Sequence, residues 1–195
     1  NPWESIYDLK FLSDVFKKDI VVRVSEDPFE IDGISYDRGT LVITRKGNEK
    51  LGLELDAILR EISKKHNTNM TSVKSGMVSK GKDFGSSKMR VIKAPKVAVL
   101  SGEDVSSYNF GEVWHYFEQQ IKYPLSVYSA KDVESIPLEK IDVLIMPQGR
   151  YGSFINQISP TEEIIEKTNA EGLFINEPPE RILEWVDSGG CLIVK

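Results

Sequence analysis

The stretch KVAVLSGEDVSSYNFGEVWHYFEQQ, residues 96–120, decides the fold class of this chain. It opens with four consecutive apolar residues at 97–100, which is typical of a strand buried on both faces. A polar loop follows at 101–107. Apolar residues then recur at helical spacing and predict an amphipathic helix over 109–122, with an apolar stripe made of Phe110, Val113, Trp114, Phe117 and Ile121. A buried strand that leads through a short loop into a helix is the opening unit of an open α/β sheet.

Two local signals refine this unit. Asn109 is the expected N-cap of the helix, and Glu112, three residues later, completes a capping box. In open α/β sheets ligands bind beyond the carboxyl ends of the strands, which places a candidate site around residues 101–108.

The second half of the chain repeats the alternation of strand and helix. It predicts a mainly parallel open sheet with helices on both faces, in an α/β fold. Right-handed crossovers then bring the loops after Leu100 and Met146 to one edge of that sheet. The further elements expected there are strands at 125–128, 141–146, 172–175 and 191–194, a short helix from Pro160 after a Ser159/Glu162 capping box, and a helix at 179–188.

The first half has shorter and more mixed elements. Pro95 restricts the conformation of Ala94, so we place the domain boundary there. Residues 1–94 form an α/β linking segment or small domain, and residues 95–195 form the α/β domain described above. The expected elements of the first half are helices at 5–17 and 51–66, short strands at 20–24, 29–31, 40–43 and 89–92, and a solvated loop at 72–87.

Composition excludes several classes of function. The chain has 195 residues, 40% of them hydrophobic, and its 30 acidic and 25 basic residues are well mixed, giving a net charge of −5. This balance argues against a nucleic-acid partner, since no basic stripe is present. No apolar stretch approaches the length of about 20 residues that a membrane span needs. Residue 1 is not methionine and a predicted strand runs almost to residue 195, so we expect a piece of a longer protein, with its second domain truncated at the C-terminus.

The reactive residue types do not form a catalytic set. His115 and Glu118 spell H-x-x-E, but catalytic zinc needs about three protein ligands, and the other histidine, His66, lies in the first half. His115 points away from the apolar stripe and is expected on the surface. Cys191 begins a strand rather than a sharp turn, so we expect a small buried apolar residue there. The sequence therefore predicts no catalytic residue, no metal ligand and no cofactor in this chain.

Two polar loops at the expected sheet edge form a candidate ligand site. Glu103, Ser106 and Ser107 follow the first strand of the domain, and Gln148 and Arg150 follow the strand at 141–146. Glu103 could pair with a substrate group, and Arg150 could hold a carboxylate through two hydrogen bonds. The alternative interpretation is that the glycines beside them only make tight strand-to-helix turns.

A family resemblance rests on three stretches. The pattern G-E-V-W-H-x-F-E-x-x-x-x-Y-P matches residues 111–124, and it is accompanied by IDVLIMPQGRY at 141–151 and ILEWVDSGGCLIV at 182–194. Together they resemble the class I glutamine amidotransferase-like domain at the C-terminus of certain bacterial zinc carboxypeptidase-like proteins. Residues 36–43 and 81–86 are similar to the segment that joins the peptidase domain to it. The resemblance implies a flavodoxin-like or amidotransferase-like sheet, a periplasmic or secreted location, and zinc only in the catalytic domain of the parent protein.

The departures from those families shape the functional expectation. The zinc ligand set of the peptidases has no counterpart here, and the amidotransferase cysteine would fall on the turn after the strand at 191–194, beyond Lys195. The resemblance thus implies a non-catalytic accessory module whose partners are the peptidase domain of the same protein and a peptide substrate. Two alternatives stay open: a domain that binds a small ligand or a peptide carboxylate, and a diverged amidotransferase-like enzyme whose nucleophile lies beyond residue 195. The oligomeric state is left open.

Overall fold

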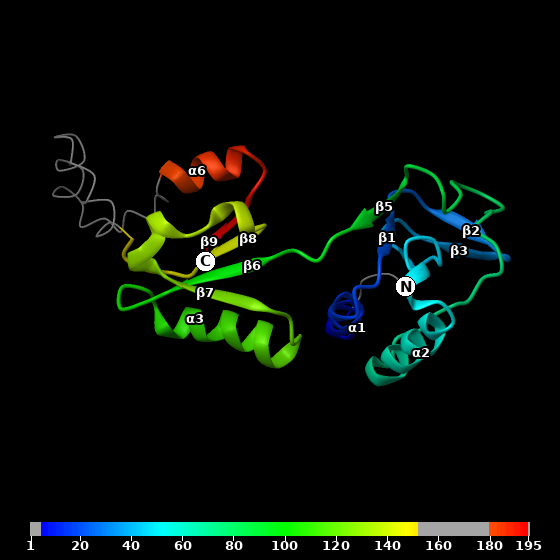
Figure 1. Cartoon of the computed structure of the whole chain (residues 1–195), viewed down its shortest axis with the longest axis horizontal. Helices are drawn as coiled ribbons and strands as arrows, with labels where there is room; N and C mark the ends of the chain where they lie inside the picture. Colours follow the sequence, from blue (N-terminus) through cyan, green and yellow to red (C-terminus); the bar gives the residue numbers. More distant parts are fainter. Residues whose placement is uncertain (1–4, 152–179, 195) are drawn as a thin grey trace. The chain divides into compact units, whose positions relative to one another are not determined.

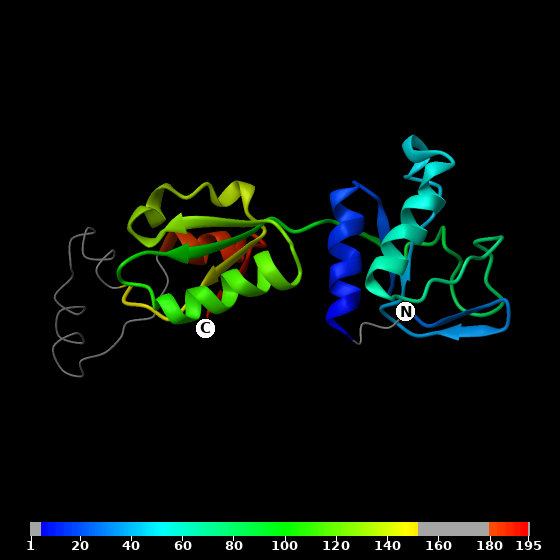
Figure 2. The same cartoon turned by 90° about the horizontal axis from the view of Figure 1, so that it is seen from below.

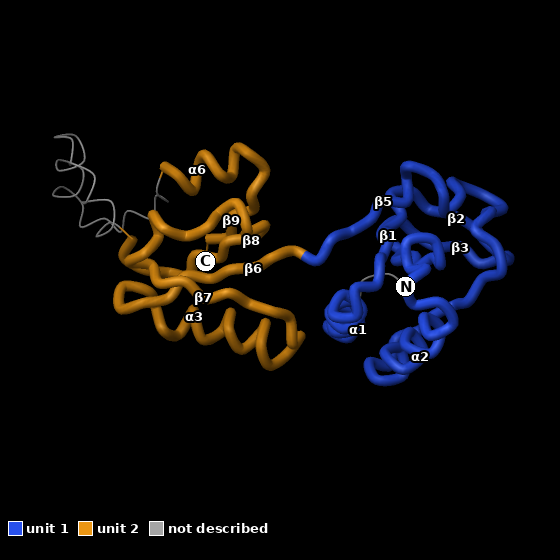
Figure 3. The backbone as a smooth tube through the Cα atoms, in the orientation of Figure 1, with its two compact units in different colours: residues 1–94 blue, residues 95–195 orange. Residues whose placement is uncertain are grey.

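The computed structural model describes residues 5–151 and 180–194 of the chain (Figure 1). It divides into two compact units, residues 1–94 and residues 95–195 (Figure 3). None of the described helices is long and apolar enough to cross a membrane.

The described part of unit 2 is built on a parallel sheet of four strands. These are β6 (Val97–Ser101), β7 (Leu125–Ser129), β8 (Val143–Met146) and β9 (Cys191–Val194), in the spatial order β7-β6-β8-β9. Every described pair in this sheet is parallel, which confirms the α/β prediction. The apolar run of β6 explains its central position, because all of residues 97–100 are buried.

Helical segments cover both faces of this sheet (Figure 2). Helix α3 (Ser107–Trp114), which continues as the π-helix η2 (His115–Gln120), packs on the face that includes Val99 and Ile145. The 3-10 segments η3 (Ala130–Ser135) and η4 (Leu138–Lys140) and helix α6 (Glu180–Asp187) belong to the opposite face. This arrangement follows from right-handed crossovers, because the chain moves one way from β6 to β7 and the other way from β7 to β8 and β9.

Three local predictions for unit 2 are wrong. The N-cap of α3 is Ser106 rather than Asn109, because the Ser106 hydroxyl accepts a hydrogen bond from the Asn109 amide at 3.3 Å and the helix starts one turn earlier. Trp114 is 41% exposed rather than part of the core, since it lies beside the buried stripe of α3. Cys191 is exposed rather than buried, because β9 is the last strand in the order of the described sheet. The helix predicted after Pro160 and the strand predicted at 172–175 lie outside the described residues.

Unit 1 is centred on a three-stranded antiparallel sheet, with two helices on one side of it and a hairpin on the other. Strand β1 (Val22–Ser25) lies between β4 (Leu41–Val42) and β5 (Met89–Ile92). Helices α1 (Ile6–Lys17) and α2 (Glu54–His66) bury Val15, Leu59 and Ile62 together with Val22. A second cluster, formed with the hairpin of β2 (Phe29–Ile31) and β3 (Ile34–Tyr36), contains Phe29, Ile31, Val42 and Met89. A 3-10 turn, η1 (Glu49–Leu51), precedes α2.

The loop at 72–87 lacks helix and strand, as predicted, but it is anchored on β2. The Glu30 amide donates to the Lys80 carbonyl at 2.9 Å, and the Lys80 ammonium lies 2.8 Å from the Glu30 carboxylate. The Phe84 ring meets the Phe29 ring edge to face. Gly81 has φ +93°, and a Cβ there would lie 2.7 Å from the Pro28 carbonyl oxygen, so this crossing point requires glycine.

Asp14 joins the two helices of unit 1. Its carboxylate accepts hydrogen bonds from Lys65 at 2.7 Å, His66 at 2.8 Å and Lys17 at 3.3 Å. Partial burial alone would raise the pKa of Asp14, but these hydrogen bonds outweigh it and lower the pKa to about 2. These hydrogen bonds to ionised Asp14 therefore stabilise the folded state fully above the ordinary pKa of 3.8, and this stabilisation is lost as the pH falls toward 2.

We expect Asp14→Asn to lower the free energy of unfolding of unit 1 by about 1–2 kcal/mol at neutral pH. The difference from the unaltered chain should shrink in acid, because protonated Asp14 and asparagine are both neutral. Urea unfolding at neutral pH and at about pH 2 measures this difference in the free energy of unfolding. A difference that is the same at both pH values would contradict the role given to Asp14.

Candidate functional site

The loops that follow β6 and β8 meet at the carboxyl end of the sheet. Val105 and Gly149 form an antiparallel bridge between them. The Ser106 amide donates to the Gln148 carbonyl at 2.7 Å, and the Arg150 amide donates to the Asp104 carbonyl at 2.7 Å. We call these two segments, residues 101–106 and 147–151, the paired loops. They meet where the direction of strand order reverses, which is the usual position of a ligand crevice in such sheets.

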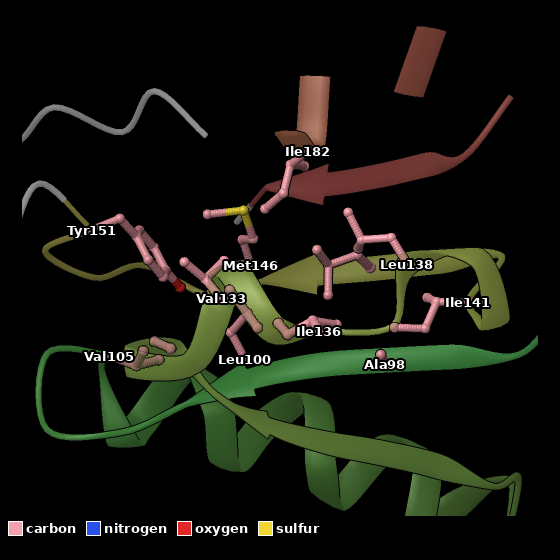
Figure 4. Packing of buried hydrophobic residues seen from close by; sticks show 12 residues of the cluster. Ala98, Leu100, Val105, Val133, Ile136, Leu138, Ile141, Met146, Tyr151 and Ile182 are labelled. Atoms are coloured by element: carbon pink, nitrogen blue, oxygen red, sulfur yellow. The ribbon is translucent and has the colours of Figure 1, made fainter. Parts of the chain in front are cut away.

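Buried side chains hold the paired loops down on the sheet. Val105 and Tyr151 belong to the same core cluster as Leu100, Met146 and Val133 (Figure 4). The Tyr151 hydroxyl donates to the Pro147 carbonyl at 2.5 Å, inside its own loop. Burial raises the pKa of Tyr151 to about 12, so this phenol stays protonated and acts as a structural donor.

Glu103 forms an ion pair at the rim of the paired loops. Its carboxylate lies 2.8 Å from the Lys131 ammonium, and both side chains are exposed. The hydrogen bond from Lys131 lowers the pKa of Glu103, so the group is ionised at neutral pH and unsuited to act as a general acid. Lys131 follows β7, the neighbour of β6, which explains why the two residues meet.

The serines and Gln148 lie around the start of α3. The Ser106 hydroxyl caps the helix, as described above, while Ser107 in the first turn is exposed. The Gln148 side-chain oxygen accepts a hydrogen bond from the side-chain amide of Asn109 at 3.2 Å. Ser106 and Gln148 are thus engaged by neighbouring groups of the chain itself.

Arg150 is exposed, and its backbone is fixed by the hydrogen bond to Asp104. Its position after β8 brings it to the same loop cluster as Ser106 and Gln148. The structure therefore places the five predicted residues on the paired loops and at the start of α3, but it engages Glu103, Ser106 and Gln148 in contacts within the chain.

The other reactive residue types lie away from this cluster. His115 is exposed, as predicted, and its ring contacts the Gln120 amide at 3.4 Å on the π-helix. Cys191 starts β9, at the opposite end of the sheet from the paired loops. Over residues 5–151 and 180–194, no three histidine, cysteine, aspartate or glutamate side chains gather in a way that could hold a metal ion.

Lys131, Asn109 and Tyr151 are the members of the cluster that sequence reasoning missed. Lys131 could have been found, because it follows the next predicted strand along the chain, and consecutive strands usually lie next to each other in a sheet. The sequence pattern at Asn109 predicts a helix cap, whereas its side-chain amide donates a hydrogen bond to Gln148. Tyr151 carried no signal beyond its position after a predicted loop.

Comparisons with known proteins found no match for this chain. No protein-family model, no curated protein and no solved structure matches it.

Proposed function

We propose that the chain is a non-catalytic accessory module of a larger zinc carboxypeptidase-like protein, where it packs on the peptidase domain or assists it. The fold proposed with it is flavodoxin-like, of the class I glutamine amidotransferase-like kind. The order β7-β6-β8-β9, with the first strand of the domain inside the sheet, agrees with that topology. The expected location is periplasmic or secreted, by resemblance.

The pairing of the loops is the observation that carries the functional proposal. A ligand crevice needs open space where the strand order reverses, and here the two loops exchange backbone hydrogen bonds across that point. Their polar side chains are held by Lys131, Asn109 and the first turn of α3. Such an arrangement supports a rigid surface better than a reactive pocket.

A carboxylate-binding site is the second candidate, and the position of Arg150 favours it. Arg150 and Ser107 are both exposed, and a guanidinium and a hydroxyl are donor groups of the kind that a peptide carboxylate accepts. The charge of the unit acts against this candidate. Residues 95–195 contain 16 acidic and 8 basic residues, a net charge of −8, so the field of the unit repels anions.

One experiment separates these functions. The purified chain is incubated with Zn²⁺ and with peptides that end in a free acidic residue; calorimetry measures binding, and chromatography of the mixture measures hydrolysis. We expect neither saturable heat nor hydrolysis products. Saturable binding that Arg150→Ala abolishes and Arg150→Lys weakens would favour the carboxylate site instead. Zinc-dependent hydrolysis that His115→Ala abolishes would overturn the accessory proposal.

A further inference from the structure

Strand β5 is the last strand of the three-stranded sheet of unit 1, in the order β4-β1-β5. Its pairing with β1 determines which of its backbone groups face outward. The Glu26 amide donates to the Lys88 carbonyl at 2.9 Å, so Lys88 directs its backbone groups toward the chain of β1. Because these directions alternate along an antiparallel pair, Arg90 does the same, while Met89 and Val91 direct their amides and carbonyls to the other side.

The outward side of β5 is occupied at Met89 and open at Val91. The Met89 amide donates to the Ser86 carbonyl at 3.1 Å, and the Met89 carbonyl accepts a hydrogen bond from the Arg23 guanidinium at 3.4 Å. Over the described part of the chain, the outward amide and carbonyl of Val91 have no such partner, and this residue is 49% exposed. One residue past the strand, the same alternation gives Lys93 an outward amide and carbonyl. This edge therefore offers four backbone groups to a further strand.

Cations surround this open edge. Residues 88–96 contain four basic residues and no acidic residue, and all four (Lys88, Arg90, Lys93 and Lys96) are exposed. Glu26 offsets part of this charge through ion pairs with Lys88 at 3.3 Å and Arg90 at 3.0 Å. Arg90 and Lys93 lie on opposite faces of the extended chain, so the charge is present on both faces. Residues 1–94 contain 14 acidic and 17 basic residues, a net charge of +3, so the field of unit 1 attracts anions.

Charged side chains on a sheet edge discourage pairing with a second copy of the same strand, because like charges would meet. The same side chains attract an extended segment of opposite charge. We propose that unit 1 binds an acidic peptide segment, which adds to the outer edge of β5 as a further strand. The peptide backbone pairs with Val91 and Lys93, and its carboxylates approach Arg90 on one face and Lys93 on the other. A polynucleotide lacks the amides and carbonyls that this edge would pair with. The contact belongs to unit 1 alone and does not depend on the accessory role proposed above.

The first test titrates the full chain with a peptide and follows the backbone amide resonances. The probe is an eight-residue peptide of glutamate and threonine with acidic side chains on both faces when extended. Its ends are blocked, which removes the terminal carboxylate that Arg150 would hold. Peptides with one acidic residue at their end, as in the calorimetry above, lack carboxylates on both faces and should not bind here.

We expect saturable shifts centred on Val91 and Lys93, and slower hydrogen exchange of the Val91 amide in the complex. The same peptide with glutamine in place of glutamate should bind at least about tenfold more weakly. The absence of a saturable shift, equal affinity for the glutamine peptide, or shifts centred on the paired loops would each overturn the proposal.

Charge reversal on the chain is the second test. Lys93→Glu should raise the dissociation constant of the glutamate peptide about fivefold or more, because a carboxylate would then face the acidic strand. Lys64→Glu is the matched control, since Lys64 is also an exposed lysine of unit 1 and lies in α2. It should change the dissociation constant by less than about twofold. An equal loss of affinity in both variants would indicate general attraction by charge and would overturn the proposal.

The third test asks whether backbone pairing forms the contact. Two versions of the glutamate peptide carry N-methyl groups on alternate amides, in the two possible phases. A strand directs every second amide to its neighbour, so one version should lose binding and the other should keep it. Equal binding of both versions, or equal affinity for a thymidine oligonucleotide, would overturn the proposal.

Discussion

Replacing Gly190 by alanine is expected to lower the free energy of unfolding of unit 2 by about 3 kcal/mol. A Cβ at this position would lie 2.2 Å from Cε2 and 2.3 Å from Cδ2 of the Trp185 indole ring. Trp185 packs against the core beneath α6, and the Gly190 amide donates to the Trp185 carbonyl at 3.0 Å. The added methyl group therefore forces the ring or the turn out of position, and β9 begins at the next residue.

Thermal unfolding followed by near-ultraviolet circular dichroism measures this effect, since Trp185 contributes to the signal. Gly111→Ala is the control, because Gly111 lies in α3 and a Cβ there meets nothing within 4 Å. That variant should be neutral or more stable by up to about 1 kcal/mol, as alanine favours a helix. Equal unfolding temperatures for the two variants would contradict the packing described around Trp185.

Replacing Gly149 by alanine is expected to cost about 2 kcal/mol and to separate the paired loops. Its Cβ would lie 2.8 Å from the Asp104 carbonyl oxygen and 3.2 Å from the Tyr151 ring. The carbonyl belongs to the backbone and accepts the Arg150 amide, so it cannot move aside without breaking that hydrogen bond. Thermal unfolding against the Gly111→Ala control measures the loss. Stability equal to that of the control would mean that the loops tolerate a side chain between them.

The central strands and main helices of unit 2 were predictable from the sequence because burial dictates them. A central strand of a parallel sheet has both faces covered, which requires an apolar run such as residues 97–100. The stripe of Phe110, Val113 and Phe117 likewise predicted the helix that packs on this strand. These patterns depend on side chains alone and can be read without knowing the neighbours.

The features that escaped prediction depend on neighbours distant in the sequence. The exposure of Cys191 depends on which strand lies at the edge of the sheet, and a short apolar run does not say so. The pairing of the loops depends on hydrogen bonds between backbone groups of residues 104–106 and 148–150, which leave no mark on residue type. Gly149 was the one residue that could have indicated this close approach of the loops. A glycine at that position is equally explained by a tight turn, so it did not predict the pairing.

In unit 1, too, local side-chain patterns predicted the helices but not the contacts between distant segments. The helices ending at Lys17 and His66 were expected from their apolar spacing. The attachment of the 72–87 loop to β2 was not expected. It depends on one bridge between Glu30 and Lys80 and one ring contact by Phe84, which give no periodic pattern in the sequence. Local glycine and serine content described the loop correctly but could not show where it lies.

Amide hydrogen exchange at Ser106 and Arg150 tests the account most directly, because their two amides join the paired loops. In the unaltered chain we expect both amides to exchange as slowly as those of β6 and β8, and we expect Gly149→Ala, but not Gly111→Ala, to remove this protection. Exchange of both amides at the rate of unstructured backbone in the unaltered chain would contradict the account, since the end of the sheet would then be open to a ligand.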